Sequence, residues 1–401
     1  MRIGVASLFN PKSVQEFLYE GTVLPEINKG ITAVNTLVRE FLMQGHSVTV
    51  FTYAPMDKPL TILEGERIKI YILNKDYHVK GLMNLERIYM LPKLKKIIAK
   101  EIDNLDVIHA HWTYDFALAA KKFAKRVPVF CSVRDWCPYI LSMQDSLKGK
   151  IVWAISWLIF KQVMKGNDIH FLANSQYTYD RITTAYPEKQ VVIIPNPIDK
   201  IFVLDEPKLT NKKVSFISIS QAAEDKRKNF DRLLQAFALY HKYNPESELK
   251  LAGYGFSEEF PIVRKWKSQG LLNGVVLCGY VNHVKLMSLI DESTCLIHPS
   301  LEETFGNIFL EGMARYVPVI GGKDSGAVPQ VLGQGKYGIL CDVTDVNSIF
   351  EAMKLTEDGE QMSQLTAAAS KYIKENFKSD AIVRRHIEIF TTAKPNHLKT
   401  S

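Results

Sequence analysis

Two glutamates eight residues apart bracket a glycine turn in the stretch "EETFGNIFLE". Glu303 and Glu311 flank Phe305, Gly306 and Asn307. Apolar residues then recur at helical spacing, which predicts a helix that starts at Gly306 or Asn307, with Glu303 in the loop before it and Glu311 about one turn inside. The backbone N–H groups of such a helix start suit hydroxyls and phosphates. The acids could bind the diols of a sugar and a ribose, or could be only acids favoured by the helix dipole.

A basic cluster stands at a second expected helix start. Lys226, Arg227 and Lys228 follow the apolar strand "KVSFISIS" and precede the amphipathic segment "NFDRLLQAFALYHKY". Basic side chains beside free N–H groups could hold a diphosphate, although the segment could also be an exposed basic loop. Gly30, in "NKGITAVNT", would let the backbone approach a ligand after the first strand. The surrounding residues do not form G-x-G-x-x-G, so they do not support a dinucleotide site.

The elements that position these residues alternate between strands and helices. In the first half, apolar strands are expected at "RIGVASL", "SVTVFTY", "DVIHAHW", "VPVFCSV", "IHFLANS" and "VVIIPNP", with helices at "GITAVNTLVREFLMQG" and "DFALAAKKFAKR" between them. Gly45 is expected to end the first helix. Such alternation predicts a parallel sheet that is covered by helices on both faces.

The pattern starts again in the second half. Strands are expected at "KVSFISIS", "ELKLAGYG", "GVVLCGYV", "STCLIHPS" and "VPVIGG", and a last helix at "KSDAIVRRHIEIFTTA". The segment 195–213, rich in Pro, Asn and Lys, should contain the domain boundary. We therefore predict two Rossmann-like, doubly wound parallel-sheet domains that face each other across a cleft, with ligands at the carboxyl ends of the strands.

Charge and composition limit the classes of function. The net charge of +7 belongs to residues 1–200, which hold 26 Lys and Arg and 19 Asp and Glu, whereas residues 201–401 hold 24 of each. This excess indicates either a solvated basic surface or attraction to an anionic surface or acceptor. No nucleic-acid-binding module accompanies it. The five cysteines are scattered without a C-x-x-C pair, which is typical of reduced core residues in a cytosolic protein.

Membrane segments are not predicted from the sequence. The start "MRIGVASLFN" is typical of a strand and a loop, so we expect no signal peptide. The longest apolar run, "IVWAISWLIF", is too short to cross a bilayer. Trp153 and Trp157 in this run predict a packed helix or, alternatively, a helix that rests on a membrane surface. We therefore expect a cytoplasmic protein that could bind peripherally to the inner face of the membrane.

Together these motifs resemble those of the GT-B-fold glycosyltransferases of the family 4 type, over nearly the full length of the chain. The resemblance is most specific in the E-x7-E block, and the order of the other motifs adds to it. The matching segments are "HPSLEETFGNIFLEGMARYVPVI", "KRKNF", "LAGYG", "LCGYV", "DVIHAHW", "LANS" and "VIIPNPID".

The resemblance implies a retaining, metal-independent transfer from a nucleotide-diphosphate sugar. Glu303 would contact the hydroxyls of the donor sugar, while Lys228, with Arg227, would neutralise the leaving diphosphate. The sequence contains no Asp-x-Asp, which fits a site without a metal, and no cofactor is expected. Other positions implied to bind or adjoin the donor are Phe305, Gly306, Asn307, Glu311, Tyr280, Val281 and Gly30.

The implied domains are residues 1–200 for the acceptor, with the last helix at about 380–395 returning to them, and residues 201–379 for the donor. The sequence departs from the family in the first of these. Arg134 and Asp135 stand where the family often has His-Asp, and an arginine cannot act as a base. These two residues could bind an anionic acceptor or form a structural pair. His109 and His111 lack the further ligands of a metal site.

The expected function is transfer from a nucleotide sugar, UDP-linked by preference, to a glycan or lipid-linked saccharide, in cell-surface polysaccharide biosynthesis. The alternatives are a non-catalytic protein that binds nucleotide sugars or glycans, and a nicotinamide-dependent oxidoreductase, which the missing G-x-G-x-x-G disfavours. The sequence leaves the sugar, the base, the acceptor and the linkage open.

Overall fold

The chain divides into two compact units, each built on its own sheet. Unit 1 comprises residues 1–199 and the segment from Ser379 onward, and unit 2 comprises Lys200–Lys378. The structure is a computed structural model that describes residues 1–27, 31–75, 85–208 and 213–393. Gly30 lies outside the described residues.

Unit 1 contains an eight-stranded sheet in the order β3-β4-β2-β1-β5-β6-β7-β8. All pairings are parallel except that of β3 with β4. The six strands predicted from the sequence are present. The two that were not predicted, β3 and β4, lie together at one edge, and β3 makes this edge antiparallel. The strands are β1 (Arg2–Ala6), β2 (Ser47–Ala54), β3 (Leu60–Glu64), β4 (Ile68–Asn74), β5 (Val107–His111), β6 (Val129–Val133), β7 (His170–Ala173) and β8 (Val191–Ile193).

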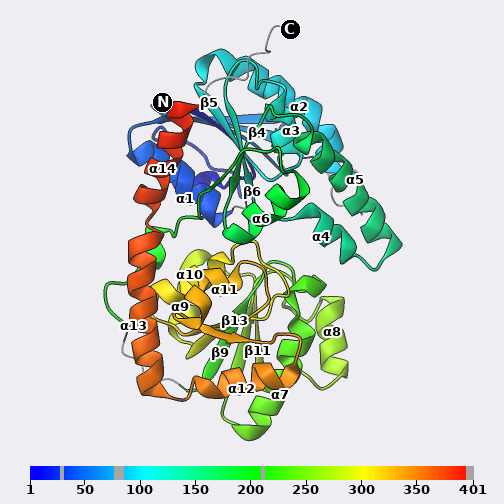
Figure 1. Ribbon diagram of the computed structural model, residues 1–401, viewed down its shortest axis with the longest axis vertical. Coiled ribbons are helices and arrows are strands. Elements are labelled where there is room, and N and C mark those ends of the chain that lie inside the picture. Colours follow the sequence, from blue (N-terminus) through cyan, green and yellow to red (C-terminus); the bar gives the residue numbers. More distant parts are fainter. Residues whose placement is uncertain (28–30, 76–84, 209–212, 394–401) are drawn as a thin grey trace. The chain divides into compact units, whose positions relative to one another are not determined.

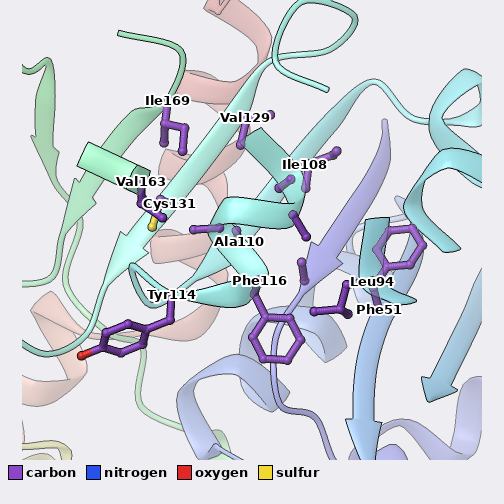
Figure 2. Packing of buried hydrophobic residues seen from close by; sticks show 14 of the residues in the cluster. Phe51, Leu94, Ile108, Ala110, Tyr114, Phe116, Val129, Cys131, Val163 and Ile169 are labelled. Atoms are coloured by element: carbon purple, nitrogen blue, oxygen red, sulfur yellow. The ribbon is translucent and has the colours of Figure 1, made fainter. Parts of the chain in front are cut away.

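Helices cover both faces of this sheet, which explains why the inner strands β5 and β6 are buried at every position. One core joins the strands to α2, α3, α5 and α6 (Figure 2). The other joins them to α1 and to α14, which lies beside α1 (Figure 1). Gly45, with a φ of +86°, follows the end of α1 as predicted. The helices are α1 (Thr32–Met43), α2 (Glu86–Glu101), α3 (Asp115–Lys121), α4 (Cys137–Ser142), α5 (Leu147–Met164), α6 (Gln176–Ala185) and α14 (Ser379–Thr392), with 3-10 turns η1 (Pro11–Phe17) and η2 (Ile102–Asn104).

Unit 2 contains a wholly parallel six-stranded sheet in the order β11-β10-β9-β12-β13-β14. The core on one face joins the strands to α7, α8 and α12, and α10 packs against β12 and β13 on the other. Five strands match the predicted ones, and β14 was not predicted. The strands are β9 (Ser215–Ile219), β10 (Glu248–Ala252), β11 (Val275–Gly279), β12 (Cys295–His298), β13 (Val319–Gly322) and β14 (Ile339–Cys341).

The helices of unit 2 follow its strands in the alternating order that the sequence predicted. They are α7 (Phe230–Tyr243), α8 (Pro261–Ser268), α9 (His283–Asp291), α10 (Asn307–Ala314), α11 (Val328–Val331), α12 (Val346–Leu355) and α13 (Gly359–Asn376), with 3-10 turns η3 (Lys200–Phe202), η4 (Lys226–Lys228) and η5 (Gly333–Gly335). Among the residues described in both units, no helix is long and apolar enough to cross a bilayer.

A close approach of two loops shapes the carboxyl edge of this second sheet. Gly253, which follows β10, has a φ of +126°, and a Cβ atom there would lie 1.8 Å from the backbone oxygen of Ser220, which follows β9. Gly253 also donates its N–H to the backbone oxygen of Gly279 at 2.7 Å. Only glycine allows three strand ends to meet in this way.

We expect Gly253→Ala to destabilise unit 2 by about 3 kcal/mol or more, because the side chain adds backbone strain and a steric clash. Thermal unfolding monitored by circular dichroism measures the effect. Gly359→Ala is the matched control, since its Cβ would meet nothing within 4 Å at the start of a helix. Equal melting temperatures for the two variants would contradict the prediction.

Candidate functional site

An ion pair between Lys228 and Glu303 forms the centre of the candidate site in unit 2. The Lys228 Nζ atom lies 2.5 Å from Oε1 of Glu303. The two side chains are 20% and 16% exposed, so water reaches each of them only in part. They come from the loops that follow β9 and β12, neighbouring strands whose carboxyl ends lie at the same sheet edge. The basic loop and the acidic loop that the sequence analysis singled out therefore meet at this edge.

The backbone fixes the position of Lys228. Asn229 adopts a left-handed conformation, with a φ of 58°, between η4 and α7. Its side-chain amide donates to the backbone oxygens of Pro299, at 3.1 Å, and Val343, at 2.7 Å. The N–H of Leu301 donates to the backbone oxygen of Arg227 at 2.7 Å. These bonds join the loop of Lys228 to the loop of Glu303, so the ion pair lies between two segments that are already connected.

His298 is a site residue that the sequence analysis did not identify. It is the last residue of β12, it is buried, and its Nε2 atom lies 2.9 Å from Oε1 of Glu303. Because a carboxylate only accepts hydrogen bonds, Nε2 is the donor. The ring packs edge-on against Phe309, with the ring centroids 5.7 Å apart. The signal available in the sequence was a histidine at the end of a buried strand, five residues before Glu303.

The charges around Glu303 keep it ionised. Burial raises the pKa of this carboxyl group, but the charge of Lys228 and the hydrogen bond from His298 outweigh burial and hold the pKa well below its usual range. Burial also lowers the pKa of His298, although Glu303 opposes this change. A carboxylate with so low a pKa is a poor general base at neutral pH, because proton transfer is most efficient near the working pH. Glu303 is therefore suited to accept hydrogen bonds from hydroxyl groups.

Arg227 points its guanidinium to other acids. Its Nη2 atom lies 2.7 Å from Asp225 Oδ2, and its Nη1 atom lies 3.7 Å from Glu302 Oε2. Asp225 also accepts a hydrogen bond from the N–H of Arg227 at 2.9 Å. The structure thus separates two neighbouring basic residues: Lys228 faces Glu303, and Arg227 holds the turn together.

The helix that follows Glu303 begins where the sequence predicted. Gly306, with a φ of +87°, precedes α10, so Glu303 lies in the loop and Glu311 is the fifth helical residue. A Cβ atom on Gly306 would lie 2.7 Å from the Phe309 ring, so glycine is required for this turn. The Phe305 side chain is buried against Phe377, which leaves its backbone as the part that could bind a ligand.

Three further segments lie around the same sheet edge: the start of α10, the loop at Gly326 and the segment that follows β11. In the first, Asn307 is the first residue of α10, and Glu311 is buried farther along the same helix. Glu303 also forms a parallel bridge with Gly326, and its backbone oxygen accepts from the N–H of Ala327 at 2.8 Å. The third segment follows β11.

Tyr280 and Val281 form this third segment. The Tyr280 side chain is 53% exposed, and Val281 is half-buried. The glycine before them, Gly279, has a φ of +60° and accepts the hydrogen bond from Gly253. Both residues therefore sit at the carboxyl edge of the sheet that carries Glu303, with an aromatic ring open to solvent.

The acceptor-side candidates lie in unit 1, directly after β6. The Arg134 Nε atom donates to Nδ1 of His111 at 3.1 Å, and its Nη1 atom donates to Oδ1 of Asn196 at 2.7 Å. Burial lowers the pKa of Arg134 to about 10, so the guanidinium remains charged at neutral pH. Asp135 accepts a hydrogen bond from Tyr114 at 3.0 Å.

His109 and His111 belong to a buried cluster of imidazole rings. Their ring centroids are 4.1 Å apart, and His386 of α14 lies 5.3 Å from His109. Burial lowers the pKa of both His109 and His111 well below the ordinary value, so both are neutral. Within the described ranges, no group of three potential ligands could hold a metal ion.

Comparisons with known proteins identify the family of both units. Residues 204–375 match the family model described as "Glycosyl transferases group 1", and residues 32–200 match "Glycosyltransferase Family 4". The N-acetyl-alpha-D-glucosaminyl L-malate synthase of Bacillus anthracis is 26% identical over 310 residues, which cover 74% of this chain and 77% of that protein.

Solved structures share the fold over almost the whole chain. Sucrose-phosphate synthase from Thermosynechococcus elongatus gives a TM-score of 0.77 at 16% identity, with 98% of both chains covered. Anabaena HepE in complex with UDP and glucose gives a TM-score of 0.67 at 15% identity, covering 98% of this chain and 100% of that one. These similarities confirm the predicted GT-B fold.

The low pKa of Glu303 predicts how the stability of unit 2 depends on pH. A carboxyl group whose pKa is depressed in the folded state stabilises that state above its unfolded pKa, ordinarily 4.5, and this contribution is lost as the pH falls toward the folded pKa. The advantage of the wild type over Glu303→Gln in the free energy of unfolding should therefore shrink between about pH 6 and about pH 3.

Urea unfolding at the two pH values measures this advantage. Glu375→Gln, at an exposed position on α13, is the control for a general acid effect. An advantage that stays constant over this range would show that the pKa of Glu303 is not depressed.

Proposed function

Because this chain belongs to the glycosyltransferases of family 4, we propose that it moves a sugar from a nucleotide-diphosphate sugar, with UDP preferred, to a glycan or lipid-linked saccharide acceptor. We propose that transfer retains the configuration of the sugar, needs no metal ion, and serves cell-surface polysaccharide biosynthesis. The observation that carries this proposal is the Lys228–Glu303 pair at the carboxyl edge of the second sheet, beside the start of α10.

Each group has a physical role in the proposed donor site. Lys228 would neutralise the charge that develops on the leaving diphosphate, with Arg227 holding the turn that presents it. Glu303, kept ionised by its neighbours, would accept hydrogen bonds from the sugar hydroxyls. The backbone of Phe305, Gly306 and Asn307 would supply N–H groups.

The remaining contacts of the proposed site would place the nucleoside and the acceptor. Glu311 would bind the ribose diol, and Tyr280 and Val281 would lie near the base. Gly30 would adjoin the donor, and Arg134 and Asp135 would serve the acceptor side. The similarity to HepE, whose structure was solved in complex with UDP and glucose, supports a nucleotide-sugar donor.

The proposed reaction breaks the bond between the anomeric carbon and the diphosphate oxygen. The acceptor oxygen bonds to the same carbon on the same face, and its proton passes to the departing diphosphate. This scheme requires no side chain to act as a base, which agrees with the low pKa of Glu303. It places most of the catalytic effect on the charge of Lys228.

We also propose that the protein is cytoplasmic and contacts the inner face of the membrane peripherally, since a lipid-linked acceptor would be held there. The basic excess of the first 200 residues supports this location.

A ligand panel tests the donor. UDP, GDP, ADP and their sugars are each added at high concentration, and the favoured nucleotide should raise the melting temperature, because ligand binding stabilises the folded state by mass action. A response to UDP-sugars alone would support the proposal. A response to NAD(P)H alone would instead support an oxidoreductase.

Lys228→Ala and Glu303→Ala should each lower the rate of sugar transfer by about 100-fold or more while the protein stays folded, because each removes a charge at the reacting centre. The rate of transfer from the favoured donor is measured as the release of nucleoside diphosphate. Lys371→Ala, at an exposed position on α13, should be unaffected. Wild-type rates in both site variants would refute the assignment, and nucleotide binding without transfer to a broad panel of acceptors would favour a non-catalytic binding protein.

His298 should act as a positioning residue for Glu303. His298→Leu removes the donor at 2.9 Å and should lower kcat about 10-fold with little change in the donor KM, because the carboxylate loses one of the two bonds that orient it. His298→Gln should recover most of the rate, since its amide N–H can donate. Equal losses in the two variants would indicate a packing role only.

A further inference from the structure

Helix α5 is apolar on two opposite faces. On one face, Val152, Ser156, Ile159 and Phe160 are buried, and the last two belong to the core that contains the sheet of unit 1. Leu147, Ile151 and Leu158 are 75%, 51% and 56% exposed. Their spacing of four and seven residues places these three on one stripe, opposite the buried face. A surface helix ordinarily carries polar residues there, so this exposed stripe requires an explanation.

The helices around this stripe are strongly basic. Helix α5 has no Asp or Glu, and Lys148, Lys150 and Lys161 flank its exposed stripe. Helices α2 and α3, with the turn that ends at Arg126, lie in the same layer. The segments 86–101, 115–126 and 147–164 together contain twelve Lys and Arg and three Asp and Glu. The charge excess of the chain is therefore concentrated in this one layer.

The three acids of the layer face inward. The Glu86 carboxylate pairs with Lys75 at 2.7 Å, and its side chain is 16% exposed. Glu101 is buried and hydrogen-bonded to Tyr71, and Asp115 is buried at the start of α3. Basic residues therefore make up an even larger share of the charged residues on the outer surface of the layer than they do in the three segments as a whole.

Helix α5 is held firmly on the unit. Arg87 of α2 donates to the Ser156 hydroxyl at 2.7 Å, and its guanidinium lies 3.8 Å from the centroid of the Tyr114 ring. Trp153 packs against the same Tyr114 ring, and Lys161 lies over the Trp157 ring at 4.4 Å. The sequence predicted a packed helix or a membrane-surface helix, and the structure shows one that is packed on one face and apolar on the other.

We propose that the outer surface of α2, α3 and α5 docks on an anionic lipid bilayer, with α5 parallel to the membrane. Leu147, Ile151 and Leu158 enter the boundary of the acyl chains, and the flanking lysines contact lipid phosphates. A second copy of this chain would bring the same positive charge and be repelled. A nucleic acid would match the charge but leave the apolar stripe exposed to water.

The biological purpose of this docking surface rests on the proposed function, because the surface would bring the enzyme to a lipid-linked acceptor. The binding itself depends on the three helices of unit 1. Vesicle binding and sugar transfer are separate measurements, so either proposal can fail while the other stands.

Co-sedimentation of the full-length protein with vesicles tests the docking surface. We expect binding to vesicles of equal parts phosphatidylcholine and phosphatidylglycerol, no binding to phosphatidylcholine alone, and weaker binding as salt is added. Lys148→Glu/Lys150→Glu should weaken binding at least ~25-fold, because each charge near an anionic surface contributes about fivefold. Ile151→Glu/Leu158→Glu should abolish it.

Matched variants in unit 2 control for charge and hydropathy. Lys267→Glu/Lys371→Glu and Leu239→Glu/Leu355→Glu make the same chemical changes at exposed positions and should bind like the wild type. Circular dichroism and the nucleotide-induced rise in melting temperature verify that all variants fold.

Several results would overturn the proposal. They are failure of the wild type to bind anionic vesicles at low salt, equal binding by the test and control variants, and self-association through this face in sedimentation analysis. Tighter binding to a duplex DNA probe than to the vesicles, lost in the lysine variant alone, would likewise assign the surface to nucleic acid.

Discussion

The ion pair between Lys228 and Glu303 is the interaction on which the candidate site depends. Removing two charges from water is costly, and their attraction offsets that cost only when the geometry is good and further hydrogen bonds satisfy the ions. Here the side-chain amide of Asn229 and the backbone N–H of Leu301 fix the geometry, and His298 supplies the additional bond to the carboxylate. The pair is therefore a property of two joined loops as much as of two side chains.

The same pair determines what kind of chemistry Glu303 can perform. A carboxyl group buried in an apolar pocket would have a raised pKa and could carry a proton. Lys228 and His298 reverse that effect, so Glu303 remains an anion that accepts hydrogen bonds. In the proposed function, the lysine that would stabilise the leaving group and the glutamate that would bind the sugar therefore hold each other in place.

Much of this arrangement could be predicted from the order of residue types. The apolar strands, the glycine turn at Gly306 and the positions of Glu303 and Glu311 follow from local periodicity and from the conformational freedom of glycine. Strands β3, β4 and β14 were not predicted, because β3 and β4 mix polar with apolar residues and β14 is only three residues long, so each resembles a loop when read without its sheet partners. Helix α3 is also shorter than its pattern indicated, ending at Lys121.

The roles of adjacent charged residues could not be predicted in the same way. Lys226, Arg227 and Lys228 are similar in sequence, and only the tertiary positions of Asp225, Glu302 and Glu303 separate them. His298 was missed for a related reason: its partner lies across a turn whose shape depends on the bridge between Glu303 and Gly326. Likewise, the sequence allowed α5 to be either a packed helix or a helix on a membrane surface. The structure shows that one face is packed, but it does not identify what covers the exposed apolar face.

The return of α14 to the first unit has a consequence for biosynthesis. Unit 2 is continuous in sequence, so all its strands and helices are synthesised before α14. Unit 1 is not, because Ile382, Val383 and Phe390 of α14 belong to the core shared with α1. While the whole second unit is synthesised, one face of the sheet formed by the first 199 residues therefore remains incompletely covered. Folding of the nascent chain is therefore expected to finish at the amino-terminal unit, the part that was synthesised first.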